Sequence, residues 1–236
     1  MNYLYVVGTP IGNLEDMTLR AMRVLKEVDY VLCEDTRVTR TLLDHYEIKT
    51  PTMSYHSHSK MYEVERIMSL LKEGKSLALV SDAGTPAISD PGSLLVHAVK
   101  KQIDQGLLPK VSVVAIPGAS ALVSALSVSG VPSSDFLFLG FLPHKKGRQT
   151  LFAEIAESKR PVVFYESPHR IIKTLQALAK AVPERKVVIA RELTKIFEQV
   201  VSGTPEELIA HFKKHGDTVR GEFVVIVSCK GEASSV

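Results

Sequence analysis

One loop constrains this chain more than any other stretch, because it joins an apolar run to a helix-like segment through two glycines and two prolines. Residues 77–80 are short and fully apolar, which is typical of a buried strand. Residues 81–92 follow as the loop, and Asp90 and Pro91 are placed to cap and open the next helix. Glycine lets a backbone approach a ligand closely, and ligands of open α/β sheets bind beyond the carboxyl ends of strands. The sequence therefore predicts a ligand-binding loop here, in preference to an ordinary tight connection.

Strand-like and helix-like segments alternate through the first half of the chain. We expect strands at 4–7, 30–33, 53–55, 77–80 and 111–116, and helices at 18–28, 36–46, 60–71, 90–101 and 120–128. This alternation is typical of an α/β fold with a mostly parallel sheet and helices on both faces. The Gly-Val-Pro-Ser-Ser segment at 130–134 breaks the pattern. We therefore expect the first domain to span residues 1–130.

The second half, residues 131–236, has a different pattern of strand-like and helix-like segments. We expect strands at 136–139, 162–165, 187–190, 196–201 and 223–228, and helices at 149–156, 168–181 and from 204 onward. Thr204 and Glu207 have the spacing of a capping box, with Pro205 at the first helical position. Because turns rather than long helices separate the later strands, this half predicts a mixed α+β domain with antiparallel strands.

Composition places few limits on function. The chain has 236 residues, 45% of them hydrophobic, with a net charge of +3. Such a chain buries a substantial core without disulfides, and Cys33 and Cys229 lie too far apart to suggest a metal motif. No stretch approaches the ~20 apolar residues that a membrane helix requires, and the first residues lack the basic start of a signal peptide. We therefore expect a cytoplasmic protein without a membrane partner.

Two further loops rich in glycine and proline follow strands of the first half, at 8–13 and 116–121. In a parallel sheet these two loops and the loop at 81–92 meet at one edge. The first is not a G-x-G-x-x-G motif, and Pro10 removes a backbone donor that a pyrophosphate would use. Gly74-Lys75-Ser76 lacks the upstream glycine of a phosphate-binding P-loop and precedes a strand. The edge therefore favours a ligand with little phosphate, although each loop alone is also compatible with a simple turn.

Charged motifs leave several interpretations open. Glu34, Asp35 and Arg37 follow a strand, where acids also stabilise a helix N-terminus. His56-Ser57-His58 has no third ligand at a useful spacing, so we expect a polar loop and no metal site. Basic loops at 144–148, 166–170 and 191–195 predict a cationic face suited to phosphates, although most charge runs are only solvated. The neighbouring aromatics either stack on bases or belong to the core; they are Phe141, Tyr165 and Phe197.

Six motifs together resemble one known group of proteins. They are Val-Ser-Asp-Ala-Gly-Thr-Pro at 80–86, Pro-Gly-Ala-Ser at 117–120, Gly-Phe-Leu-Pro at 140–143, Phe-Tyr-Glu-Ser-Pro-His-Arg at 164–170, Arg-Glu-Leu-Thr-Lys at 191–195 and Arg-Gly-Glu-Phe at 220–223. In this order, over residues 3–228, they resemble the ribosomal RNA small-subunit methyltransferase I group of the tetrapyrrole methylase superfamily. The resemblance implies a two-domain tetrapyrrole methylase-like fold with S-adenosylmethionine (SAM) in the interdomain cleft, in a homodimer.

The resemblance also implies a reaction and a set of contacts. The reaction is 2′-O-methylation of a cytidine in the decoding site of 16S rRNA, on the small ribosomal subunit, with neither DNA nor metal involved. The residues that match cofactor contacts of the family are Pro10, Gly84, Thr85, Ile88, Ser120, Ala121, Tyr165, Glu166, Leu193 and Thr194. Superfamily members that act on tetrapyrroles carry Gly-Asp-Pro where this chain has Gly-Thr-Pro at 84–86, which favours the RNA group. Relatives often continue beyond the last strand, so we expect any RNA contact of that segment to be absent here.

Catalytic and RNA-binding residues follow from position beside those contacts. Positioning accounts for much of a methyl transfer, and a nearby base helps the hydroxyl lose its proton. Glu166, Glu192 and Lys195 adjoin the expected cofactor contacts, while Glu34, Asp35, Asp82, His56 and His169 stay unranked as bases. The expected RNA contacts are Lys145, Lys146, Arg148, Arg170 and Lys195. The alternatives are a tetrapyrrole methyltransferase and a ribosome-binding module without activity.

Overall fold

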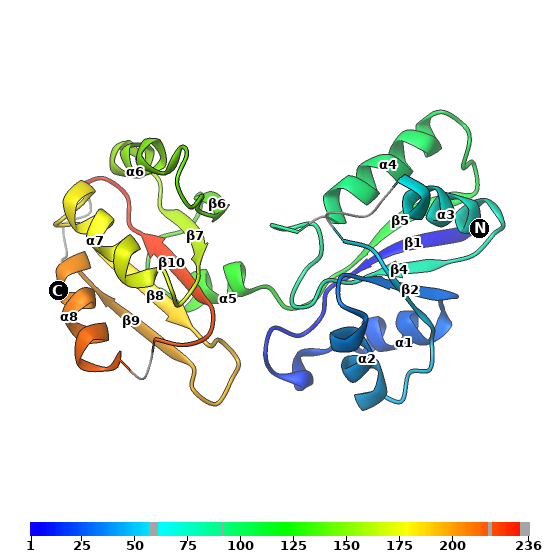
Figure 1. Ribbon diagram of the computed structural model, residues 1–236, viewed down its shortest axis with the longest axis horizontal. Coiled ribbons are helices and arrows are strands. Elements are labelled where there is room, and N and C mark those ends of the chain that lie inside the picture. The colour runs from blue at the N-terminus through cyan, green and yellow to red at the C-terminus, as the bar shows by residue number, and fades with distance from the viewer. Residues whose placement is uncertain (57–60, 91, 217–218, 232–236) are drawn as a thin grey trace. The chain divides into compact units, whose positions relative to one another are not determined.

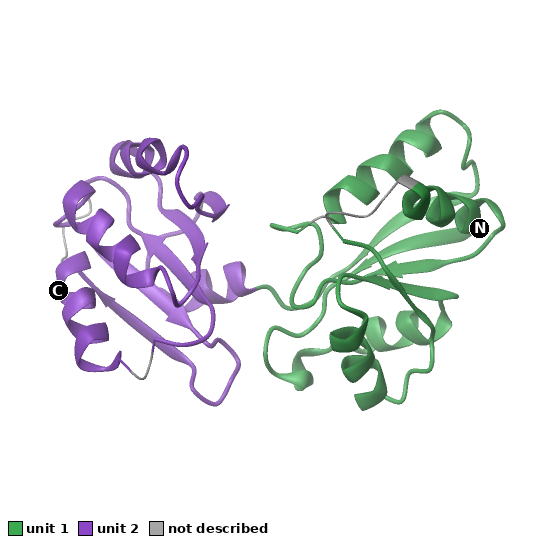
Figure 2. Cartoon of the chain, in the orientation of Figure 1, with its two compact units in different colours: residues 1–120 green, residues 121–236 purple. Residues whose placement is uncertain are grey.

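The computed structural model describes residues 1–56, 61–90, 92–216 and 219–231. The chain forms two compact units, Met1–Ser120 and Ala121–Val236 (Figure 2). The division falls earlier than the expected boundary between residues 130 and 131. Helix α5 (Ala121–Val128) contacts strand β10 (Phe223–Val227), so packing assigns this helix to the second unit.

The first unit contains a five-stranded sheet in the order β3-β2-β4-β1-β5, and every pairing is parallel. The strands are β1 (Asn2–Val7), β2 (Tyr30–Cys33), β3 (Thr52–Ser54), β4 (Leu77–Leu79) and β5 (Val111–Ile116). The parallel α/β sheet predicted from the sequence is confirmed.

Helices cover both faces of this sheet, as predicted. The helices α1 (Leu19–Glu27) and α2 (Thr36–His45) lie on one face, and α3 (Met61–Lys72) and α4 (Gly92–Asp104) lie on the other (Figure 1). A short 3₁₀ helix, η1 (Leu14–Asp16), follows β1. The start of α4 at Gly92 agrees with the predicted cap, because Asp90 Oδ1 accepts the N–H of Gly92 at 2.8 Å; Pro91 lies outside the described residues.

Alternation along β4 divides the core of the first unit into two layers. Ala78 packs in the layer that includes Leu25 of α1, and Leu77 and Leu79 pack in the layer that includes Ile67 of α3. A strand that is buried on both faces needs an apolar side chain at every position. This requirement explains the unbroken apolar run before the loop at 81–92.

The second unit contains a mixed five-stranded sheet in the order β6-β7-β10-β8-β9. The pairing of β6 with β7 is parallel, and the other three pairings are antiparallel. The strands besides β10 are β6 (Leu137–Phe141), β7 (Val162–Glu166), β8 (Val187–Arg191) and β9 (Gln199–Gly203). The mixed domain predicted for this half is confirmed. Strand β9 begins later than the expected residue 196, because residues 192–198 form a turn described below.

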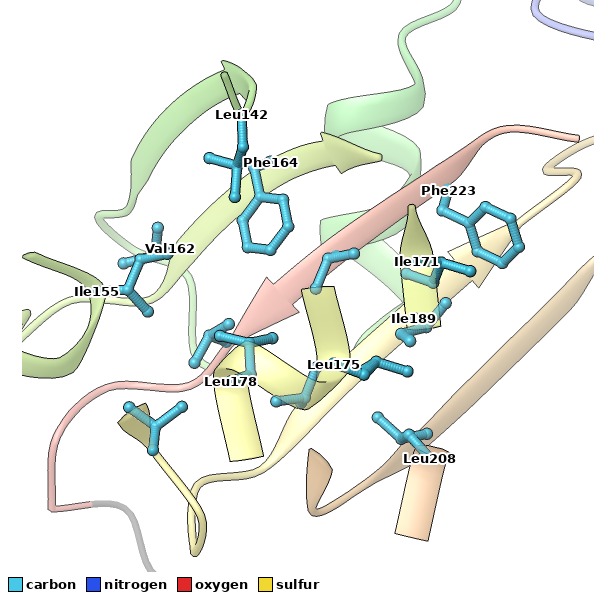
Figure 3. Close-up of a cluster of buried hydrophobic side chains, with 14 of the residues drawn as sticks. Leu142, Ile155, Val162, Phe164, Ile171, Leu175, Leu178, Ile189, Leu208 and Phe223 are labelled. Carbon is cyan, nitrogen blue, oxygen red and sulfur yellow. The ribbon is translucent and has the colours of Figure 1, made fainter. Parts of the chain in front are cut away.

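Helices α6 (Arg148–Glu157), α7 (Ile171–Ala181) and α8 (Pro205–Lys214) complete the second unit. The core gathers Phe164 of β7, Leu175 of α7, Leu208 of α8 and Phe223 of β10 (Figure 3). The capping box of α8 is present in both directions, between Thr204 and Glu207. None of the helices in the described ranges is long and apolar enough to span a membrane.

Candidate active site

Three loops meet at the carboxyl edge of the first unit's sheet. The loop after β1 and the loop after β4 are joined by two backbone hydrogen bonds: the N–H of Thr9 donates to the carbonyl of Gly84 at 2.9 Å, and the reverse bond is 3.1 Å long. The hydroxyl of Thr85 donates to the carbonyl of Ala119 at 3.1 Å, which joins the loop after β4 to the loop after β5. The convergence predicted from the sequence is therefore present.

Glycines make this close contact between loops possible. A Cβ atom on Gly118 would lie 2.8 Å from the carbonyl oxygen of Gly8, which is closer than real side chains approach backbone. Gly84 has a φ of +79°, and a Cβ there would lie 3.3 Å from a methyl group of Ile11. At Gly8 and Gly118 the backbone is thus packed against itself and only glycine fits, whereas at Gly84 the positive φ favours glycine.

The loop after β4 keeps an unusual backbone beyond Gly84. Ala87 and Ser89 have φ values of 71° and 65°, in the left-handed region that side-chain-bearing residues rarely adopt. Asp90 holds this conformation, because its Oδ1 accepts the N–H groups of Ala87 at 2.7 Å and Gly92 at 2.8 Å. Conformations of this kind cost free energy and gather at ligand sites.

The residues expected to contact the cofactor in the first unit all lie on these loops. Pro10 and Gly84 are buried, Thr85 and Ser120 are half-buried, and Ile88 is exposed. Ala121, the next residue, begins α5 of the second unit. Of the set, only Ile88 presents a large apolar side chain to solvent at this edge, with an exposed fraction of 45%.

A cavity of about 490 Å³ lies beside these loops within the first unit. It is lined by residues 9–12 and Leu14, by one face of α2, and by residues 81–83. Pro10 lines it, and Ser81–Ala83 lead directly into Gly84. The cavity thus adjoins the expected cofactor contacts.

The acidic residues at this edge differ in environment. Asp35 caps α2 by accepting the N–H of Arg37 at 2.8 Å, and hydrogen bonds from the Arg37 side chain lower the pKa of Asp35 to about 2. Asp82 Oδ1 accepts the N–H of Asp35 at 3.2 Å. Burial raises the pKa of Glu34, and the nearby charges of Asp90 and Asp82 add to that rise. Asp35 therefore fills the structural role left open for this motif, as the N-cap of a helix.

In the second unit, Glu166 lies at the centre of a buried network. Its side chain is fully buried and accepts hydrogen bonds from the N–H of Ser167 at 2.8 Å and the hydroxyl of Thr174 at 2.6 Å. The guanidinium of Arg170 lies 2.6 Å from Oε1, and that of Arg148 lies 3.6 Å from Oε2. Because donors surround the carboxylate, Glu166 is better suited to holding these segments together than to accepting a proton.

The two arginines of this network differ from the lysines beside them. Arg148 also donates to the hydroxyl of Thr174 at 2.6 Å and to the carbonyl of Pro143 at 3.2 Å, and Arg170 donates to the carbonyl of Leu142 at 2.8 Å. Their side chains are only 17% and 15% exposed. Lys145 and Lys146 are exposed. Of the expected RNA contacts in this region, only these lysines present their charge to solvent.

The turn between β8 and β9 carries the remaining expected site residues. Glu192 and Thr194 have φ values of 50° and 67°, and Leu193 between them is buried. Lys195 Nζ lies 2.8 Å from Glu192 Oε1, and the N–H of Thr194 donates to Glu198 Oε2 at 2.6 Å. Side-chain contacts within the turn thus hold two residues in strained conformations.

Two residues that sequence reasoning did not assign support this part of the site. A Cβ on Gly221 would lie 1.8 Å from Oε1 of Glu192, so the glycine leaves the space in which that carboxylate rests. Gly221 belongs to the Arg-Gly-Glu-Phe motif at 220–223, so this motif could have indicated its role from the sequence. Thr174 completes the Glu166 network from α7, and no local sequence pattern marked it.

Tyr165, which is expected at the cofactor, packs against the rings of Phe138 and Phe141, and burial raises its pKa.

Within the described ranges, no group of three or more histidine, cysteine, aspartate or glutamate side chains is placed to hold a metal ion. His56 lies in these ranges, whereas Ser57 and His58 of the same motif lie outside them.

Comparison with known proteins identifies the class to which this architecture belongs. The family model of Tetrapyrrole (Corrin/Porphyrin) Methylases matches residues 3–209, so the chain belongs to that family. A solved structure of uroporphyrin-III C-methyltransferase from Thermus thermophilus, complexed with S-adenosylhomocysteine, is similar with a TM-score of 0.61 at 18% identity. The match covers 97% of both chains and shows the shared fold.

Within the family, the chain belongs with the Ribosomal RNA small subunit methyltransferase I proteins. It is 48% identical over 231 residues to the protein of that name from Halalkalibacterium halodurans, covering 97% of this chain and 76% of the relative. It is 45% identical over 230 residues to the protein of that name from Thermotoga maritima, covering 98% of this chain and 100% of the relative. The resemblance inferred from the six motifs is confirmed.

Proposed function

We propose that this chain is a SAM-dependent methyltransferase that methylates the ribosomal RNA of the small ribosomal subunit. The observation that carries the proposal is the match, over nearly the whole chain, to relatives that are named for this activity. The reaction implied by the shared motifs is transfer to the ribose 2′-hydroxyl of a cytidine in the decoding site of 16S rRNA. The protein would act in the cytoplasm as a homodimer.

The residues at the expected contacts fit a SAM molecule. In the first unit, Gly84 has a positive φ, which glycine adopts without strain, and Pro10 and Thr85 lie on the loops that meet there. In the second unit, Oγ1 of Thr194 is buried and finds no hydrogen-bond partner in the described part of the chain. A buried hydroxyl without a partner costs free energy, which a polar group of a ligand would recover. The buried side chain of Leu193 adds apolar surface beside it in the sequence.

When bound, SAM supplies a methyl group on a sulfonium sulfur. The residues of this chain then have to hold the acceptor in line and take up the hydroxyl proton. Glu166 is unsuited to the proton, because donors surround its buried carboxylate. Glu192 and Lys195 suit the task better: the carboxylate accepts a proton, and the ammonium beside it stabilises negative charge on the acceptor oxygen.

A tetrapyrrole methyltransferase is the second candidate, because solved structures of that kind share the fold. Three features argue against it: their low identity, the Gly-Thr-Pro sequence at 84–86 and the higher identity to the RNA group. The two candidates differ in acceptor and not in cofactor.

The deciding experiment measures transfer of labelled methyl from SAM to purified small subunits that lack the modification. Label should appear in 16S rRNA as a 2′-O-methylated cytidine, and uroporphyrinogen offered in parallel should stay unlabelled. Absence of both SAM binding and methyl transfer would favour a ribosome-binding module without activity. Label in the tetrapyrrole alone would favour the second candidate.

A further inference from the structure

The cavity of about 490 Å³ beside the loops after β1 and β4 has no role in the function described so far. Its volume falls within the range of small-molecule sites. Every lining residue belongs to the first unit, from the loop after β1, from α2 and from the loop after β4. Its position therefore depends on one rigid sheet and one helix.

The surface of the cavity is mostly apolar, although polar residues also line it. Pro10, Val38 and Leu42 are among its apolar residues, and Thr41, His45 and Asp82 are among its polar ones. Oδ1 of Asp82 accepts the N–H of Asp35 at 3.2 Å, which fixes the carboxylate beside the N-terminus of α2, the helix that lines the cavity. A planar ring that carries an amino group matches this lining, because the ring packs on the apolar surface and the amino group donates to the carboxylate.

Charge at the edge excludes other occupants. Asp82 lines the cavity, and the charges of Asp82 and Asp90 both lie close enough to Glu34 to affect its ionisation. His45 also lines the cavity and can bond a polar group. The acids disfavour a phosphate or the carboxylate-bearing rim of a tetrapyrrole. An uncharged nucleoside portion of an RNA is not repelled, provided that its phosphates stay outside the cavity.

The cavity lies beside the expected cofactor contacts, where the methyl acceptor has to be placed. The acceptor oxygen has to come within about 3–3.5 Å of the transferred methyl group, in line with the bond that breaks. The cavity shares Pro10 with the expected cofactor contacts, and residues 81–83 of its wall precede Gly84. Enzymes that modify nucleotides often extrude the target nucleoside from its stack into such a pocket.

We infer that this cavity receives the acceptor nucleoside of the RNA, with Asp82 accepting the amino group of its cytosine. The inference rests on the proposed function for its substrate class. It adds a binding site in the first unit to the basic loops expected to contact RNA in the second.

A matched pair of cavity-filling variants tests the site. Thr41→Trp places a large ring into the cavity from an exposed position on α2. The control, Ser69→Trp, places the same ring into a second cavity of about 470 Å³ that α3 and α4 form on the other face of the sheet. Both positions are exposed, so both variants should fold and keep the melting temperature within a degree or two of the parent.

Thr41→Trp should reduce kcat/KM for methyl transfer to small subunits about 100-fold, while Ser69→Trp should equal the parent. The Kd for SAM should be the same in all three proteins. Equal transfer by the two variants would overturn the inference. A weakened SAM affinity in Thr41→Trp alone would also overturn it, because the cavity would then belong to the cofactor.

Cytidine itself provides a probe that does not depend on transfer. In methyl-labelled protein, cytidine should shift the NMR signals of Val38 and Leu42 in the parent and in Ser69→Trp, but not in Thr41→Trp. Uridine should shift them less, because it presents a carbonyl where cytidine presents an amino group, and Asp82→Asn should remove this preference. No shift with millimolar cytidine in the parent would overturn the nucleoside site. If the parent shows the shifts but transfers no methyl to small subunits, the proposed function fails while the site stands.

Discussion

The loop edges of the two units are held together in different ways. At the edge of the first unit, backbone packs on backbone: Thr9 pairs with Gly84 in both directions, and Gly8 and Gly118 leave no space for a side chain. In the second unit, charged side chains connect the loops, through Glu166 with two arginines and through Glu192 with Lys195. One edge depends on the absence of side chains and the other on their charges.

This difference shows what each edge is suited to do. A backbone edge offers fixed N–H and carbonyl groups and close approach, which suits a cofactor of constant shape. A side-chain edge contains buried charges whose balance matters, because removal of one partner leaves the other without compensation. Substitutions should therefore affect stability most in the second unit and cofactor binding most in the first.

The largest effect is expected from Glu166→Ala. It leaves Arg148 and Arg170 mostly buried without their counter-charge, which should lower the free energy of unfolding by about 3–5 kcal/mol. Urea unfolding measures the decrease. Glu157→Ala is the control, because the pair of Glu157 with Lys230 is exposed and should contribute less than about 1 kcal/mol. Equal decreases in the two variants would show that the buried network stabilises the fold no more than an exposed ion pair does.

The next effect tests the backbone edge. In Gly118→Ala the new methyl group would lie 2.8 Å from the carbonyl oxygen of Gly8, so the two loops must separate. We expect stability to fall by about 1–3 kcal/mol and the affinity for SAM, measured by calorimetry, to weaken. Gly216→Ala, which has open space around its Cβ, should change neither quantity. Unchanged SAM affinity in Gly118→Ala would separate the backbone edge from the cofactor.

A smaller effect, confined to RNA binding, is expected from the exposed lysines of the second unit. Replacing Lys145 and Lys146 with alanine should weaken binding to small subunits and reduce its salt dependence by roughly 0.7–0.9 units of slope for each phosphate that is no longer neutralised. Stability should stay within about 0.5 kcal/mol of the parent, because neither side chain is buried. The paired control is Lys213→Ala with Lys214→Ala on α8. Equal slopes for the two double variants would contradict the basic face.

The smallest effect concerns an exposed ion pair at the edge of the first unit. Because hydrogen bonds from Arg37 lower the pKa of Asp35 to about 2, the stabilisation from this pair is present above the ordinary aspartate pKa and is lost as pH falls through about 2. Arg37→Ala should raise the pKa of Asp35 and flatten the pH dependence of stability between about pH 4 and pH 2. An NMR titration of the Asp35 carboxyl measures the shift. Arg23→Ala, which removes another exposed pair, should leave it unchanged.

Local sequence was sufficient to predict the class of the fold and the edge of the first sheet at which three loops meet. The apolar run before residue 81 and the glycines and prolines after it act through local backbone preferences, which a sequence records directly. The parallel pairing in the first sheet followed from alternation of strands and helices, and the capping box at Thr204 followed from spacing. The six motifs were sufficient to indicate the family.

Which charged side chains reach solvent, by contrast, depends on the packing of segments that lie far apart in the chain. Arg148 and Arg170 have the sequence of a basic loop, yet both meet Glu166, because β7, α6 and α7 bring residues from different segments into one buried network. The contact of Gly8 with Gly118 and the assignment of α5 to the second unit arise in the same way. Local sequence sets the preference of each segment, whereas pairing between distant segments depends on packing, which no short stretch of sequence encodes.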